Sequence, residues 1–157
     1  MKLRGLLFAV CAPLTACGTS VPVTEVMNYD RCTTAEASVA LVSLGDIASL
    51  RSSRLLGMTN PPVDTDPALQ LIAISRGEQP TPGFGFDLLG ASRHGRDIEL
   101  RLHWRTPEPD AVLAQMITSP CIVVGMETAD AARVLVSLDD GTKLGELTFA
   151  TGESIDR

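Results

Sequence analysis

The segment "FGFDLLGASRHGRDIELRLHWR", residues 84–105, constrains the fold most strongly because its second half alternates apolar and polar residues. The apolar set is Ile98, Leu100, Leu102 and Trp104, and the polar set is Glu99, Arg101, His103 and Arg105. A period of two places one set on the core face of a strand and the other in water. "RHGR" supplies the turn before this strand, with Gly95 free to adopt a positive φ. The pattern predicts a β-hairpin.

The loop before the hairpin, "GEQPTPGFGF", holds closely spaced glycines and prolines. We expect Gly77 to end a preceding strand, the two prolines to stiffen the connection, and Gly83 to permit a tight turn. Alternation then sends Phe84, Phe86 and Leu88 to one face, and with Trp104 the two phenylalanines are expected to supply much of the bulk of the core.

Further strand patterns follow the same logic of apolar, partly β-branched runs bounded by turn residues. They cover residues 38–44, 68–75 and about 121–126, and the segment "ARVLVSLDDGTKLGELTF" supplies a final strand, the turn "DDGT" and a short terminal strand. A short helix is expected over 46–58, with Asp46 as N-cap and Gly57 near its end. The sequence therefore predicts a mainly β fold, a single small antiparallel β-sandwich or barrel-like domain over residues 35–157 with one short N-terminal helix.

The N-terminus has the pattern of an export signal. A positive start with Lys2 and Arg4 precedes the short apolar run "GLLFAVCAP", and "LTAC" ends at Cys17. This resembles a bacterial lipobox, so we expect a signal peptide over 1–16 and acylation of Cys17, which would hold the protein on the lipid bilayer. A soluble signal peptide that happens to contain a cysteine is the alternative.

Residues 17–34 are polar without a sustained period, which favours a flexible tether. Thr19, in place of aspartate at that position, resembles the pattern of lipoproteins sent on to the outer membrane. We therefore expect a lipid-anchored protein of the bacterial cell envelope, facing the periplasm or the cell surface. The formal net charge is −6 and there is no basic stripe, which argues against nucleic acid as a partner.

Removal of the signal peptide would leave Cys32 and Cys121 as the cysteines that carry no lipid. In an oxidising compartment two such thiols most simply form a disulfide. Two alternatives remain: a buried free Cys121, and a nucleophilic Cys121 that would need a base such as His94 or His103.

Catalytic and metal-binding patterns are sparse. There is no G-x-S-x-G nucleophile motif and no metal-spaced cluster of cysteine and histidine, so no metal or other cofactor is expected. His94 lies in a turn and His103 on the wet face of a strand, where both are expected to be solvated. "ETAD" at 127–130 and "LDDGT" at 138–142 lack the ligand spacing of a calcium loop and are expected to be turns.

A resemblance to a known family rests on residues 70–126. An apolar strand is followed by Gly, Pro-Thr, Gly and an aromatic, then by a strand pair, a proline-bearing loop, and a Gln with a short step to Pro and the strand segment 122–124. The matching positions are Gly77, Pro80, Thr81, Gly83, Phe84, Gln115 and Pro120. This ordered set resembles the PrcB family, lipoprotein subunits of a secreted protease complex. Cys121 stands where the family often has an aromatic, and the usual aromatic-rich helix before the domain is represented only by "DIASLRSSRLLGM".

The resemblance implies a non-catalytic role, in which the protein associates with or stabilises a secreted or membrane-associated protease. Two other functions stay open at this point. One is a lipid-anchored hydrolase that uses His94 or His103 with Cys121 or a serine, and the other is a lipoprotein that captures a small ligand.

Overall fold

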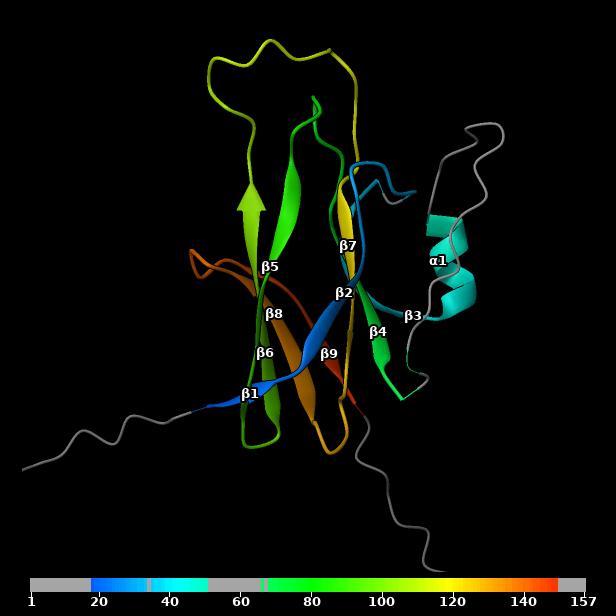
Figure 1. The fold of residues 1–157 in the computed structure, drawn as a ribbon, viewed down its shortest axis with the longest axis vertical. Helices are drawn as coiled ribbons and strands as arrows, with labels where there is room; N and C mark the ends of the chain where they lie inside the picture. Colours follow the sequence, from blue (N-terminus) through cyan, green and yellow to red (C-terminus); the bar gives the residue numbers. More distant parts are fainter. Residues whose placement is uncertain (1–17, 34, 51–65, 67, 150–157) are drawn as a thin grey trace, which may run out of the picture.

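The computed structural model describes residues 18–33, 35–50, 66 and 68–149, and Figure 1 shows them as two β-sheets with one short helix at the side. The first sheet has the strand order β1-β5-β6-β8-β9 and the second has the order β2-β7-β4-β3. The strands of the first sheet are β1 (Thr19–Val21), β5 (Gly85–His94), β6 (Asp97–Arg105), β8 (Arg133–Leu138) and β9 (Lys143–Thr148). Those of the second are β2 (Val23–Tyr29), β3 (Ala37–Val42), β4 (Gln70–Arg76) and β7 (Cys121–Met126).

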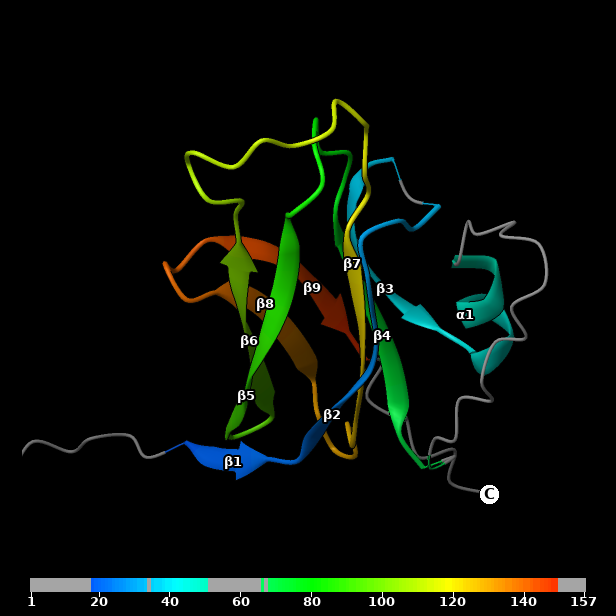
Figure 2. The same ribbon diagram turned by 45° about the horizontal axis from the view of Figure 1, so that its top comes forward.

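The fold is therefore mainly β and sandwich-like, and the two sheets do not close into a barrel (Figure 2). Strand β2 lies near β5 and β3 lies near β9, but no ladder joins either pair in the described residues. Inward residues of both sheets form one apolar core, in which Ile72, Phe86, Leu100 and Val124 are fully buried. The expected sandwich-like arrangement of two facing sheets is confirmed, and the barrel-like arrangement is not.

The predicted hairpin is confirmed as β5 and β6, which pair from Gly85–Arg105 to His94–Asp97. Gly95 has a φ of 63°, as the turn requires. Ile98, Leu100 and Leu102 are fully buried, whereas Arg101 and His103 on the same strand are exposed. The alternation in the sequence thus reports the two faces of β6 correctly.

The first sheet is mixed rather than antiparallel, because β6 pairs with β8 in parallel from Asp97–Arg133 to Leu102–Leu138. The chain leaves β6, crosses to the second sheet to form β7, and returns to the first sheet as β8 running in the direction of β6. Local alternation defines the faces of a strand and not its neighbour, so the expectation of a purely antiparallel sheet was wrong at this pair.

The tether expected over residues 17–34 is also wrong for most of that range. Strand β1 pairs with β5 through Val21 and Ala91, and β2 pairs with β7 through Tyr29 and Cys121. Pro22 lies between the two strands, where its missing N–H removes no ladder bond and the chain changes from one sheet to the other. Several side chains of these two strands are exposed and polar, which is why the composition of the segment resembles that of a flexible tether.

The helix α1 (Leu44–Leu50) begins earlier than expected and covers the outer face of the second sheet, where Ile47 packs with Met27, Leu71 and Val123. Ser43, not Asp46, is its N-cap. The Asp46 carboxylate accepts one hydrogen bond from the Ser43 backbone N–H at 2.9 Å and another from the Ser43 hydroxyl at 2.7 Å. These bonds lower the pKa of Asp46, and the bond from the backbone is the main cause. Residues 51–58 of the expected helix lie outside the described residues.

Candidate partner-binding loops

The seven family-motif positions gather at one end of the sandwich. Five of them lie in the β4–β5 connection, and Gln115 and Pro120 lie in the long β6–β7 connection. Both connections rise from the same end of the molecule in Figures 1 and 2. The Gln79 N–H donates to the Thr118 carbonyl at 2.7 Å, and the Thr118 N–H donates to the Gln79 carbonyl at 2.9 Å. The two connections are therefore joined by an antiparallel bridge.

Thr118 fixes this junction further. Its side chain is 2 % exposed, and its Oγ1 donates to the Thr81 carbonyl at 3.0 Å. A buried hydroxyl needs such a partner, since an unpaired one would lose its bond to water without replacement. Thr118 is not among the residues singled out from the sequence, where a threonine in a proline-marked loop gives no signal of burial.

Two motif glycines are required by their surroundings. Gly77 has a φ of 82°, and a Cβ there would lie 3.0 Å from the Ala35 carbonyl oxygen of the β2–β3 connection. Gly83 has a φ of 98°, and a Cβ there would lie 3.1 Å from Cγ of Pro107. A side chain at either position would meet both backbone strain and a neighbour from another connection. The expectation of a tight turn at Gly83 agrees with its positive φ.

The aromatic residues form a cluster beneath these loops. The rings of Phe84 and Trp104 stack with centroids 5.8 Å apart, and Phe86 meets Trp104 edge-on at 4.8 Å. The Arg76 guanidinium lies 4.9 Å from the Trp104 ring centroid. Phe86 is fully buried, whereas Phe84 and Trp104 are half-buried. Of the three aromatic side chains that were expected to fill the core, one therefore lies inside it and two lie at its edge.

A third connection, between β2 and β3, joins the same end through a disulfide. Cys32 and Cys121 are bonded, with their Cα atoms 6.0 Å apart and both side chains buried. The Cys32 N–H donates to the Ser119 carbonyl at 2.8 Å, and the Ser119 N–H donates to the Asp30 carbonyl at 3.0 Å. The structure thus contains the predicted disulfide, and it gives Cys121 no free thiol for either alternative role.

Residues 118–121, here called the stem, are therefore held from both sides. Residues 108–117, here called the tip, project beyond the two sheets (Figure 1). In the tip Val112 is fully exposed, Ile117 is 64 % exposed and Met116 is 38 % exposed. Gln115 also lies in the tip and is exposed, whereas Pro120 in the stem is buried. The sequence analysis described this segment only as a proline-marked loop.

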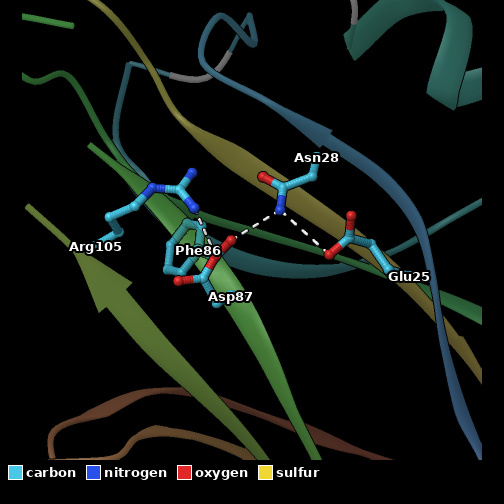
Figure 3. Close-up of polar contacts among 5 residues, drawn as sticks. All are labelled: Glu25, Asn28, Phe86, Asp87 and Arg105. Carbon is cyan, nitrogen blue, oxygen red and sulfur yellow. Dashed lines mark hydrogen bonds and ion pairs between the residues drawn. The ribbon is translucent and has the colours of Figure 1, made fainter. Parts of the chain in front are cut away.

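Figure 3 shows two sets of polar contacts, of which the one made by Asn28 joins the two sheets. Asn28 of β2 donates through Nδ2 to the Phe86 carbonyl of β5 at 2.8 Å and to Oε2 of Glu25 at 3.2 Å. Arg105 donates through Nη1 to Oδ1 of Asp87 at 2.6 Å on the outer face of the first sheet. The Asn28 side chain thus joins β2 to β5, two strands between which no ladder forms in the described residues.

The two histidines lie apart on the first sheet. His94 is at the hairpin turn, with Nε2 at 3.4 Å from Oγ of Ser92. His103 lies opposite Asp87 on the exposed face, with Nδ1 at 2.7 Å from Oδ2 of Asp139. A catalytic triad needs a histidine that contacts both a nucleophile and an acid. In the described part of the chain His94 contacts only a serine and His103 only an aspartate, so neither histidine has both partners.

The two acidic segments are turns. The Thr142 N–H donates to Oδ1 of Asp140 at 2.8 Å, which lowers the pKa of that carboxyl, and Gly141 has a φ of 87°. Asp130 has a φ of 60° in the other turn. No group of three or more His, Cys, Asp or Glu side chains is placed to hold a metal ion within residues 18–33, 35–50, 66 and 68–149.

A pocket of about 430 Å³ lies beside β1 and the irregular part of β5, away from the motif loops. It is lined by Val21, Val23, Leu89 and Arg101 among others, and it is open to solvent. The small-ligand alternative placed its site in the sheet interior, which is filled by side chains in the described residues.

Cys17 and the expected signal peptide over 1–16 lie outside the described residues. Among the helices that the structure does describe, none has the length and apolarity to cross a membrane.

Comparison with known proteins identifies the part of the chain that contains the loops. Residues 71–127 match the family model described as PrcB C-terminal, a range that begins in β4 and ends just after β7. No curated protein and no solved structure matches the chain. The matched range includes all seven motif positions, the stem and the tip. The resemblance seen in the sequence is therefore confirmed for residues 71–127, the range that matches the PrcB C-terminal family.

Proposed function

We propose that this protein is a non-catalytic accessory subunit of the bacterial cell envelope, anchored by lipid at Cys17, which binds and stabilises a partner protein such as a secreted or membrane-associated protease. The single observation that carries the proposal is the PrcB C-terminal match over residues 71–127, because it covers two of the three joined connections at one end of the sandwich, β4–β5 and β6–β7. The match to the PrcB family points to a protease complex as the setting for the partner.

Two further observations support the proposal. The lipobox-like "LTAC" ending at Cys17 favours acylation and a place on the envelope, most simply at the outer membrane. The apolar side chains of the tip form an exposed surface of the kind that marks protein interaction sites. Neither His94 nor His103 has, among the described contacts, the pair of partners that a hydrolase would need.

The decisive experiment recovers the partner from the native envelope. The full-length protein with a C-terminal affinity tag is crosslinked in the cells, purified and analysed by mass spectrometry. We expect a stoichiometric protein partner with protease activity, whose abundance falls when the gene for this protein is deleted. Recovery of no protein partner would contradict the accessory role.

The anchor is tested separately with the Cys17→Ala variant and labelled palmitate. We expect the wild-type protein to incorporate the label and to remain with membranes, and the variant to do neither. Persistent labelling of the variant would contradict acylation at Cys17.

A further inference from the structure

The tip concentrates exposed apolar surface in a very short segment. Val112, Met116 and Ile117 are three of the large apolar side chains that the described residues leave exposed, and they lie within six positions of one another. Isolated exposed apolar residues are ordinary on a protein surface, whereas a cluster marks a surface that another molecule covers. The β6–β7 connection that carries these residues extends beyond the ends of the strands (Figure 1).

The stem holds this cluster in place before any partner arrives. Thr118 is bonded to Gln79 and Thr81 on one side, and Ser119 is bonded to Asp30 and Cys32 on the other. The Arg31 guanidinium contacts Sδ of Met116 and so supports the tip directly. A loop that is fixed at one end loses less conformational freedom on binding than a free one, and more of its contact energy then appears as affinity.

The charges of the tip indicate which kind of molecule covers it. Its charged residues are Glu108 and Asp110, both acidic, and both precede the apolar positions in the sequence. The Arg31 guanidinium, from the β2–β3 connection, lies at the other end of the tip against Met116. Anionic lipid headgroups would repel these carboxylates, whereas a protein groove with basic residues at its rim would attract them. A second copy of this chain is also disfavoured, because its tip would bring like charges together.

We propose that the tip inserts Val112 and Ile117 into an apolar groove of the partner protein, whose rim carries lysine or arginine residues that pair with Glu108 and Asp110. This inference rests on the proposed accessory function and specifies its binding surface. The stem acts as the rigid base, and the apolar residues of the tip supply most of the affinity.

The test places a photo-crosslinking residue at Val112, at Ile117 or, as a control, at Leu89 in the full-length protein in its native cells. Leu89 is a suitable control because it is 53 % exposed and lies on β5, outside the tip. We expect crosslinks to the partner from positions 112 and 117 and none from position 89. Mass spectrometry should place the crosslinked partner peptide among apolar residues with lysine or arginine nearby.

Binding of the purified partner to variants gives the second measurement. We expect the Val112→Ser/Ile117→Ser double variant to bind at least about tenfold more weakly, as loss of central apolar contacts does, and Leu89→Ser to bind as the wild type does. Glu108→Lys/Asp110→Lys should also weaken binding, whereas Glu127→Lys, at an exposed acidic residue outside the tip, should not.

The outcomes separate this inference from the function on which it rests. If the wild type recovers a partner and the Val112→Ser/Ile117→Ser variant binds it equally well, the tip is not the binding surface but the accessory role stands. Crosslinks from position 112 to lipid or to a second copy of this chain would likewise overturn the inference. Recovery of no protein partner by the wild type would overturn both.

Discussion

The stem and the tip belong to one connection, yet they differ sharply in burial and in hydrogen bonding. Thr118 in the stem is buried and fully bonded, whereas Val112, six positions earlier, has its side chain entirely in solvent. The backbone bonds of Thr118 and Ser119 and the disulfide of Cys121 join the stem to two other connections of the same chain. The comparison suggests that stability and binding are divided here by position: changes in the stem should act on folding, and changes in the tip should act on association.

The largest expected effect comes from the disulfide beside the stem. The Cys32→Ala/Cys121→Ala double variant should lose about 2–5 kcal/mol of unfolding free energy, as removal of a native disulfide from a small exported domain does. Urea denaturation under oxidising conditions measures this loss. Equal stability of the variant and the wild type would show that the hydrogen bonds alone hold the stem.

Gly83→Val tests the junction of the β4–β5 connection with Pro107. The residue has a positive φ, and the new side chain would press on the proline ring, so we expect a loss of about 1–3 kcal/mol. A lower melting temperature in calorimetry would agree with this expectation. The matched control is Gly141→Ala, which has a similar positive φ but no heavy atom within 4 Å of the new Cβ, and which should therefore cost less.

Thr118→Val keeps the shape of the stem residue and removes its hydroxyl. We expect a loss of about 1 kcal/mol, because the bond to the Thr81 carbonyl disappears while both backbone bonds to Gln79 remain. Thr106→Val is the control, since Thr106 is exposed in the same connection. If both variants unfold at the same urea concentration, the buried hydroxyl does not stabilise the stem.

The tip supplies the other half of the comparison. Val112→Ser and Ile117→Ser should each change the unfolding free energy by less than about 0.5 kcal/mol, because an exposed side chain loses no packing. Thermal denaturation of the two variants beside the wild type is sufficient. A loss comparable with that of Thr118→Val would mean that the tip packs against the body of the protein in solution.

An ion pair in the first sheet, away from the stem and the tip, makes a smaller contribution to the stability of the fold, and this contribution depends on pH. The hydrogen bond from Arg133 to Asp97, at 2.7 Å, chiefly lowers the pKa of Asp97. Because the folded carboxyl holds its proton less tightly than the unfolded one, this pair stabilises the fold above the unfolded pKa, and the contribution is lost as the pH falls through the lowered pKa. The difference in stability between the wild type and Asp97→Asn should therefore shrink in acid, and Arg133→Gln should show the same trend.

Local patterns in the sequence predicted the parts of the fold that depend on local chemistry. Alternation in 98–105 indicated the buried and exposed faces of β6, and "RHGR" indicated the hairpin turn. The disulfide followed from the number of cysteines and the expected compartment. Expectations that concern the lipid anchor and the signal peptide stay predictions, because residues 1–17 lie outside the described structure.

Features that depend on distant partners could not be read in the same way. Strands β1 and β2 expose much of their surface, so their composition resembles that of a linker until β5 and β7 are placed beside them. The parallel pairing of β6 with β8 depends on where β7 lies. Likewise, Thr118 looks like any loop threonine until the β4–β5 connection brings Gln79 and Thr81 to it.

The placement of β1 and β2 has a consequence for the order in which the chain folds. These strands are made first on the ribosome, but their partners are residues 91–93 and 121–126, and Cys32 must wait for a cysteine 89 positions later. Neither sheet can be completed until most of the chain has emerged, and such distant pairings are slow to form. A nascent chain with this topology stays unfolded for longer, which is the state in which a protein can be threaded through a translocation channel.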